Sequence, residues 1–268
     1  MQKSELSDYT YAVRLRPRKV LLVLLGVVGF LGFAHLAVYA IQILLQDRQH
    51  ELGGFATFFR LSREANLPTF VSALNLLAAS LLLSLIAYHK RRLGDAMRWH
   101  WAVLAGGMLL MSVDEAAQIH EGLVGRAVAH VTGPMEGIFN YVWYLAYLPL
   151  IALLAVMYIP FLRRLPTRYA LGFMLAGLLF VGGAVGVEMI ESLLNYRGTR
   201  HLFWTLSLFV EETCEMLGIV VFIYMLLCYI AEEGIAVRFS AATSEEPATA
   251  SALTETEHDP VLEEVPSS

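Results

Sequence analysis

The stretch LGFMLAGLLFVGGAVG occupies residues 171–186, and none of its side chains is charged or polar. It continues into Val187-Glu188-Met189-Ile190-Glu191 and forms part of an apolar block over residues 170–193. A helix of about 20 apolar residues crosses the ~30 Å hydrocarbon core of a bilayer. The stretch therefore predicts a membrane-spanning helix that carries two glutamates near one end.

Apolar blocks of similar length recur along the 268-residue chain, at residues 20–45, 69–88, 99–121, 141–162 and 204–231. None alternates with the two-residue period of a membrane barrel strand. Charged residues make up 16% of the chain, against about 25% in an ordinary soluble domain. We predict an all-α, polytopic membrane protein whose domain over residues 20–234 is a bundle of six transmembrane helices.

The two ends of the chain differ from this domain in composition. Residues 1–19 are basic and are expected to form a cytoplasmic segment, whereas residues 235–268 are acidic, poor in aromatics and predicted to be a disordered cytoplasmic tail. The first apolar block is longer than the 7–15 residues of a signal-peptide core, so it is interpreted as a retained anchor. No basic stripe suggests nucleic-acid binding.

The distribution of lysine and arginine over the loops predicts the orientation of the chain in the membrane. Thirteen of the 19 fall in the terminal segments and in the loops after the second and fourth blocks, which topology places on one side. The positive-inside rule then puts both termini in the cytoplasm of a bacterium, with the chain in the cytoplasmic membrane. Interfacial aromatics agree, with Trp99 and Trp101 at the inner ends and Tyr141, Trp143 and Trp204 at the outer ends.

Acidic side chains inside the blocks are the main functional signal, because no lysine or arginine lies there with them. One ionised carboxylate in hydrocarbon costs roughly 2.5–3.5 kcal/mol even on lenient insertion scales. A metal ion, shared protons or basic residues from loops must therefore neutralise them. Counting along the helices places all seven near the outer face of the membrane: Asp114, Glu115, Glu188, Glu191, Glu211, Glu212 and Glu215.

A divalent metal site is the first hypothesis. Pairs spaced by three residues share a helical face, and inward carboxylates with histidines are typical of helical bundles that hold iron or manganese. Oxygen ligands favour manganese, iron, calcium or magnesium. Gln118 is expected to be a ligand or a hydrogen-bonding support for one. The predicted ligands are Glu115, Glu188, Glu191, Glu212, Glu215, His35 and His120.

Such a site predicts a metal-dependent membrane hydrolase or oxidoreductase that acts on a lipid or lipid-linked substrate. Glu211 and Asp114 are the candidate catalytic residues, with one carboxylate as general base for a metal-bound water. Apolar loops at residues 53–61 and 122–141 are expected to cover the site or to admit a membrane lipid. The sequence does not indicate the oligomeric state.

Two other classes of function remain open. Intramembrane acids also mark ion pathways, so the chain is alternatively a cation- or proton-coupled transporter, although its inner leaflet half has few polar side chains. In the second alternative it is a structural or sensory membrane subunit without catalysis, and Arg126, Arg197 and Arg200 neutralise part of the acids while others share protons.

Two segments carry a resemblance, REANLPTF (63–70) and SVDEAAQIHEGL (112–123). They resemble segments of multi-pass bacterial membrane proteins that carry no assigned activity. The resemblance implies a multi-pass membrane fold, and it implies neither a substrate nor a catalytic role.

Overall fold

A computed structural model describes residues 11–12, 16–44, 57–61, 66–198, 201–236 and 238–239. The chain divides into two compact units. The smaller unit contains residues 1–13 and 237–268, in which β1 (Tyr11–Ala12) pairs antiparallel with β2 (Arg238–Phe239). The larger unit, residues 14–236, contains all of the described helices.

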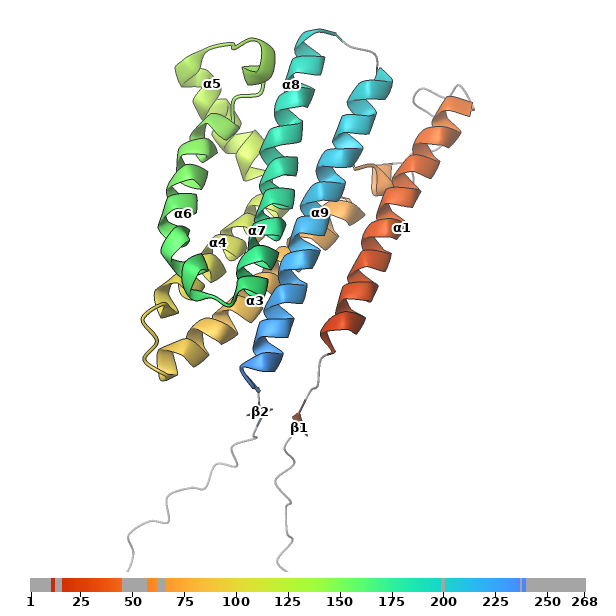
Figure 1. Cartoon of the computed structure of the whole chain (residues 1–268). Helices are drawn as coiled ribbons and strands as arrows, with labels where there is room; N and C mark the ends of the chain where they lie inside the picture. The colour runs from red at the N-terminus through yellow and green to blue at the C-terminus, as the bar shows by residue number, and fades with distance from the viewer. Residues whose placement is uncertain are drawn as a thin grey trace, which may run out of the picture. The chain divides into compact units, whose positions relative to one another are not determined.

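The larger unit is helical throughout (Figure 1). Five helices are long and apolar enough to cross a membrane, or six if the bent pair Arg98–Ala117 and Gly122–Thr132 is one span. The prediction of an all-α, polytopic membrane protein is confirmed. Along the chain the elements are α1 (Pro17–Leu44), α3 (Leu67–Arg92), α4 (Arg98–Ala117), the π-helix η1 (His120–Gly125), α5 (Arg126–Thr132), the 3₁₀-helix η2 (Gly137–Phe139), α6 (Tyr144–Arg164), α7 (Thr167–Val181), the π-helix η3 (Gly182–Val187), α8 (Glu188–Tyr196) and α9 (His201–Glu232).

The third apolar block differs from the straight helix predicted over residues 99–121. Helix α4 ends at Ala117 because Gln118 takes the left-handed conformation with φ 57°. The chain then bends by 78° before Gly122–Thr132. Asp114 helps to hold this corner, since its Oδ1 accepts the backbone N–H of His120 at 2.7 Å. Asp114 and Gln118 therefore do not share a continuous helical stripe.

Helix α9 is the central element of the helical unit, and it packs against α1, α3, α7 and α8 (Figure 1). Half of its most apolar window is buried, whereas only 11% of the corresponding window of α6 is buried. A helix that is apolar all round is suited to such a central position or to lipid contact. Hence α9 can present side chains to several neighbours at once, while α6 turns most of its surface to lipid.

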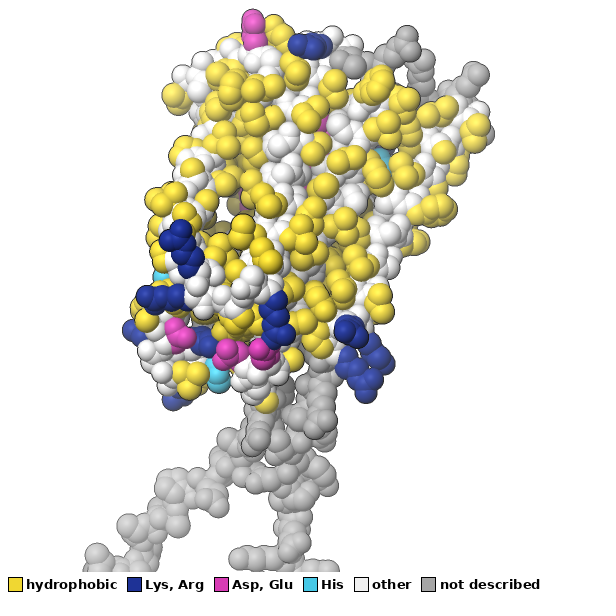
Figure 2. Space-filling model, in the orientation of Figure 1, with side chains coloured by type: hydrophobic (Ala, Val, Ile, Leu, Met, Phe, Trp, Pro, Cys, Tyr) yellow, Lys and Arg dark blue, Asp and Glu magenta, His cyan; other side chains and the backbone are white. Residues whose placement is uncertain are grey.

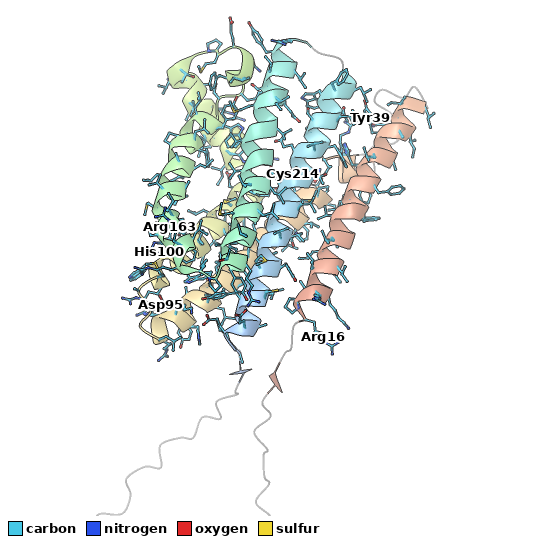
Figure 3. The ribbon with its side chains drawn as sticks, viewed as in Figure 1. Arg16, Tyr39, Asp95, His100, Arg163 and Cys214 are labelled. Carbon is cyan, nitrogen blue, oxygen red and sulfur yellow. The ribbon has the colours of Figure 1, made fainter. Side chains whose placement is uncertain are left out.

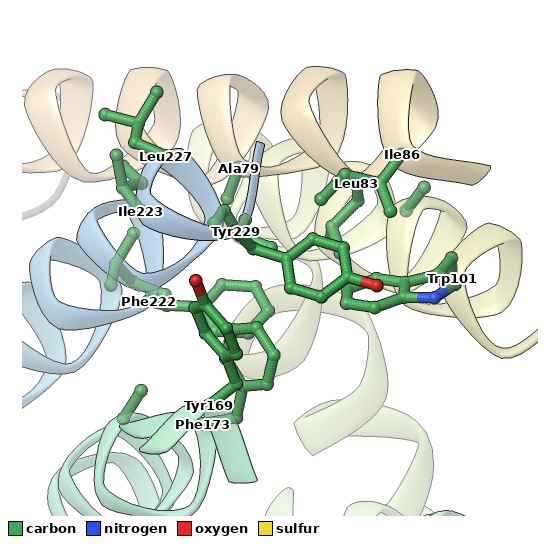
Figure 4. Packing of buried hydrophobic residues seen from close by; sticks show 14 of the residues in the cluster. Ala79, Leu83, Ile86, Trp101, Tyr169, Phe173, Phe222, Ile223, Leu227 and Tyr229 are labelled. Atoms are coloured by element: carbon green, nitrogen blue, oxygen red, sulfur yellow. The ribbon is translucent and has the colours of Figure 1, made fainter. Parts of the chain in front are cut away.

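An aromatic core closes one end of the helical unit (Figure 4). Trp101 is 1% exposed, and its ring packs 4.9 Å from those of Phe161 and Tyr229 and 6.0 Å from that of Phe173. Beyond this core, Lys90 Nζ binds Glu233 Oε2 at 2.8 Å and so joins the ends of α3 and α9. The apolar inner half predicted from the sequence is thus a packed core.

The same end carries most of the described lysine and arginine side chains (Figure 2). Arg16, Asp95 and Arg163 lie toward this end in Figure 3, whereas Tyr39 lies toward the other. The start of α1 and the end of α9 also lie at the basic end (Figure 1). This asymmetry fits the positive-inside rule, under which the basic end is cytoplasmic; the cytoplasmic placement of the termini stays a prediction.

Candidate functional site

Small residues bring α7 and η3 against α9. A Cβ atom at Gly183 would lie 2.8 Å from the backbone oxygen of Glu211 and 3.1 Å from Cβ of Cys214. At Gly218 it would lie 2.8 Å from the backbone nitrogen of Phe180. Real Cβ atoms essentially never approach so closely, so glycine allows the two backbones to touch. This contact positions the acidic residues of α8 and α9 side by side.

A π-helical segment precedes the acidic residues of α8. Residues Gly182–Val187 form η3, whose wider turn inserts one residue relative to a regular α-helix. The second π-helix, η1, follows the corner at Gln118. Single π turns inside α-helices are frequent at functional sites because they redirect the side chains that follow them. Predicted site residues mark both π segments, since η3 ends directly before Glu188 and η1 begins at His120.

Two acidic side chains of α8 and α9 lie close together. Glu191 is 3% exposed, and its carboxyl group lies near the Glu211 carboxyl group and the Ser207 hydroxyl. Its Oε1 atom is buried and has no hydrogen-bond partner among the described residues. We call Glu191 and Glu211 the carboxyl pair. A carboxylate only accepts hydrogen bonds, so a hydrogen bond within the pair would require a proton on one member.

Other predicted residues surround the carboxyl pair. Glu211 is within electrostatic range of Glu188, Glu212 and Glu215. Glu215 is in turn within range of Glu115 on α4. Acidic side chains from α4, α8 and α9 therefore share one region of the helical unit. Among the described residues, however, no group of three or more His, Cys, Asp or Glu is placed so that it could hold a metal ion.

Trp143 links the acidic residues to the corner after α4. Its Nε1–H donates to Glu188 Oε1 at 2.6 Å, and its ring lies 5.0 Å from that of His120. His120 Nδ1 lies 3.2 Å from Asp114 Oδ2, so these two predicted site residues contact each other. Tyr147 packs 5.3 Å from Trp143. Asp114 and His120 thus form a second polar contact, separate from the carboxyl pair.

His35 lies apart from the acidic residues, at the contact between α1 and α9. It is 3% exposed, and its ring stacks on Phe209 at 6.1 Å. Its Nδ1 accepts the backbone N–H of Leu61 at 3.1 Å, so His35 anchors the described part of the loop after α1. Residues 53–56 of that loop lie outside the described residues. The predicted role of His35 as a metal ligand stays a prediction.

The arginines that would neutralise the acids in a structural subunit do not do so among the described residues. The ion pairs found there involve Lys90, His120 and Arg168, and none involves Arg126 or Arg197. Arg200 lies outside the described residues. Neutralisation of the acids by these arginines therefore stays a prediction.

Sequence reasoning missed three polar contacts of the site. Trp143 was assigned to the interfacial belt, but it also binds Glu188. Ser192 is fully buried, and its Oγ accepts the N–H of Tyr141 at 2.9 Å and donates to the Gly137 oxygen at 3.2 Å. The third contact is that of Ser207 with Glu191. The available signal was Ser207, a serine four residues before Glu211, because that spacing places both side chains on one helical face.

A family model described as "Domain of unknown function (DUF8692)" matches residues 21–229. The match covers most of the chain, from the first turns of α1 to the last turns of α9, and the chain belongs to this family. No curated protein and no solved structure matches the chain.

Proposed function

We propose that this member of the DUF8692 family is a cation- or proton-coupled membrane transporter whose proton-binding site is the carboxyl pair, Glu191 and Glu211. The proximity of two carboxyl groups, one of them on the buried Glu191, carries the proposal. Such proximity favours a shared proton inside membrane-spanning helices, where free ionised carboxylates are strongly disfavoured. Intramembrane acids that exchange protons are the usual mark of an ion pathway.

Loss of the shared proton would leave a ligand set made of oxygens. Carboxylate oxygens suit hard cations such as calcium, magnesium or manganese, and Glu191 Oε1 is already buried without a partner among the described residues. Proton and cation would then compete for the same oxygens. Competition at one site is the simplest way in which the movement of one ion is coupled to the movement of the other.

The aromatic core at the basic end separates the carboxyl pair from that side, so transport would require a conformational change. Trp101, Phe161 and Tyr229 close the helical unit at its basic end. The carboxyl pair therefore exchanges with that side only if the helices move apart, as in alternating access. Helix α6 is the least buried of the five spans, but its Phe161 belongs to this core, so movement of α6 would have to separate Phe161 from Trp101.

Exchange is tested in proteoliposomes that enclose a pH-sensitive dye. We expect that an external pulse of Na⁺, K⁺, Ca²⁺ or Mn²⁺ raises the internal pH, because the entering cation displaces the proton of the carboxyl pair. Glu191→Gln and Glu211→Gln should each reduce the rate to that of protein-free liposomes. Glu136→Gln changes an exposed glutamate before η2 and should retain the wild-type rate.

Two results would contradict the transport proposal. One is a wild-type protein that moves protons with none of the four cations. The other is a wild-type rate in both carboxyl-pair variants, since the pair would then not be the coupling site. Circular dichroism of each reconstituted variant shows whether a lost rate reflects the site or a lost fold.

The second candidate is the metal-dependent enzyme, favoured by the buried, unpartnered Oε1 of Glu191. The predicted ligands do not fit a preformed metal centre as they are placed, so side chains would have to rotate to complete it. The site would offer oxygen donors from Glu115, Glu191 and Glu215. The catalytic roles of Glu211 and Asp114 toward a lipid substrate stay predictions.

Metal content separates the two candidates. If the second is right, elemental analysis of detergent-purified protein finds about one or two divalent ions per chain, as in the carboxylate bundles. Glu188→Gln combined with Glu212→Gln should then abolish the bound metal. A protein free of stoichiometric metal that still exchanges protons would support the transporter instead.

A further inference from the structure

We propose that the end of α3 binds the headgroup of an anionic phospholipid in a pocket formed by Tyr88, Arg91 and Arg92. The pocket lies at the basic end of the helical unit, away from the carboxyl pair, and the proposal does not depend on the proposed transport. The ligand chemistry is a phosphodiester whose acyl chains lie along α3.

The pocket has a volume of about 450 Å³ and is lined by these three residues. All three side chains are exposed, so the pocket is an open depression at the surface, which a headgroup could reach directly. Arg92 is held in place, since its Nε and Nη2 donate to the Tyr88 hydroxyl at 3.0 and 2.7 Å and its guanidinium lies 5.2 Å from the Tyr88 ring. An oriented guanidinium is well suited to bind phosphate oxygens in pairs.

Neighbouring charges leave the pocket positive. Lys90 points away from it and is 8% exposed, because its Nζ binds Glu233 at 2.8 Å and lies 3.9 Å from Asp95. Lys90 therefore neutralises part of the negative charge of Glu233 and Asp95. Arg91 is exposed, and no hydrogen bond or ion pair joins its guanidinium to another described residue. Two arginine charges thus remain available to an anion.

The surface next to the pocket is that of a lipid-facing helix. Leu74, Leu81 and Tyr88 follow one another at intervals of seven residues on one face of α3, and they are 47%, 63% and 57% exposed. Trp99, 64% exposed, lies at the same end, as interfacial tryptophans do. A bound phosphate in the pocket would therefore sit at headgroup depth, with an apolar track below it for an acyl chain.

This apolar track favours a lipid over a free phosphate ion. Basic residues immediately next to a transmembrane helix are attracted to anionic lipids on the cytoplasmic leaflet. The end of α3 combines that position with a pocket and an oriented arginine. Figure 2 shows further lysine and arginine side chains at the same end, which would raise the local potential without forming the pocket.

The test is native mass spectrometry of the full-length protein in detergent, titrated with phosphatidylglycerol or with phosphatidylcholine of the same acyl chains. We expect Arg91→Gln combined with Arg92→Gln to weaken phosphatidylglycerol binding at least about tenfold and to leave phosphatidylcholine binding unchanged. The matched control is Arg163→Gln with Arg164→Gln, which removes two exposed arginines at the end of α6. It should change the affinity by less than about twofold.

Two further experiments separate a loss of binding from a loss of folding, and a bound lipid from bound inorganic phosphate. Tyr88→Phe keeps both arginines and removes only the hydroxyl that orients Arg92, so a reduction of about threefold is expected even if the double variant folds poorly. Inorganic phosphate at the concentration of the lipid should not displace phosphatidylglycerol. The proposal is overturned if it does, if the α6 control weakens binding as much as the pocket variant, or if the pocket and Tyr88 variants bind phosphatidylglycerol as the wild type does.

Discussion

Leucine in place of Gly183 is expected to destabilise the helical unit by about 3 kcal/mol and to separate the carboxyl pair. Even a single Cβ atom here would meet the backbone oxygen of Glu211 at 2.8 Å. Because this neighbour is backbone, it cannot rotate away as a side chain can, and α9 must move as a unit. Glu191 and Glu211 lie on the two helices that would be pushed apart.

Thermal unfolding of the detergent-solubilised variant measures the loss of stability. The matched control is Gly177→Leu, because Gly177 is an exposed α7 glycine and a Cβ atom added to it would meet nothing within 4 Å. That substitution should be neutral or slightly stabilising, since glycine inside a helix is unfavourable by about 1 kcal/mol relative to better helix formers. Equal destabilisation by both changes would mean that the close contact between α7 and α9 does not determine stability.

The second large effect is expected at Trp143. Alanine there removes a half-buried ring and the donor to Glu188 and should cost about 3 kcal/mol. Trp143→Phe keeps most of the ring and loses the N–H, so it isolates the hydrogen bond at about 2 kcal/mol, the usual penalty when a buried polar group loses its partner. The destabilisation arises because Glu188 is only 7% exposed and water cannot readily replace the donor.

The comparison residue for Trp143 is Trp99, which is 64% exposed at the opposite end of the unit. Trp99→Phe should change the stability by less than about 0.5 kcal/mol, as surface substitutions usually do. Denaturant titration of the three variants in one detergent gives the differences. If Trp143→Phe is as stable as the wild type, the bond to Glu188 contributes nothing to the fold, and Trp143 is not the group that holds Glu188.

The membrane fold was predictable because each span is encoded locally. Twenty consecutive apolar residues leave helix as the only way to satisfy the backbone, whatever the neighbours are. The six blocks therefore match α1, α3, the bent α4 region, α6, the α7–α8 span and α9. The corner at Gln118 was not predictable in the same way, since a non-glycine residue with positive φ depends on the Asp114–His120 contact that holds it.

The site could be predicted only in part. Acid content and depth predicted one acidic site, and among the described residues Glu211 lies within electrostatic range of Glu188, and Glu215 within range of Glu115; that these residues form one functional site stays a prediction. Which acids touch depends on helix rotation and on the glycine contacts between α7 and α9, and these are tertiary properties. Thus Glu191 and Glu211 were assigned to different roles, as ligand and catalyst, although the structure places their carboxyl groups close together.

The π-helical turn at Gly182–Val187 sets the direction of the side chains that follow it in the same span. In a helix each residue adds about 100° of rotation, so one residue more or fewer in the turn would swing every later side chain of the span by that angle. The side chains of Glu188 and Glu191 would then point toward other residues, while the apolar helix α7 before the turn would keep its packing. An insertion or deletion in this turn would leave the hydropathy profile of a homologue nearly unchanged. It would nevertheless separate the acidic side chains of α8 from those of α9.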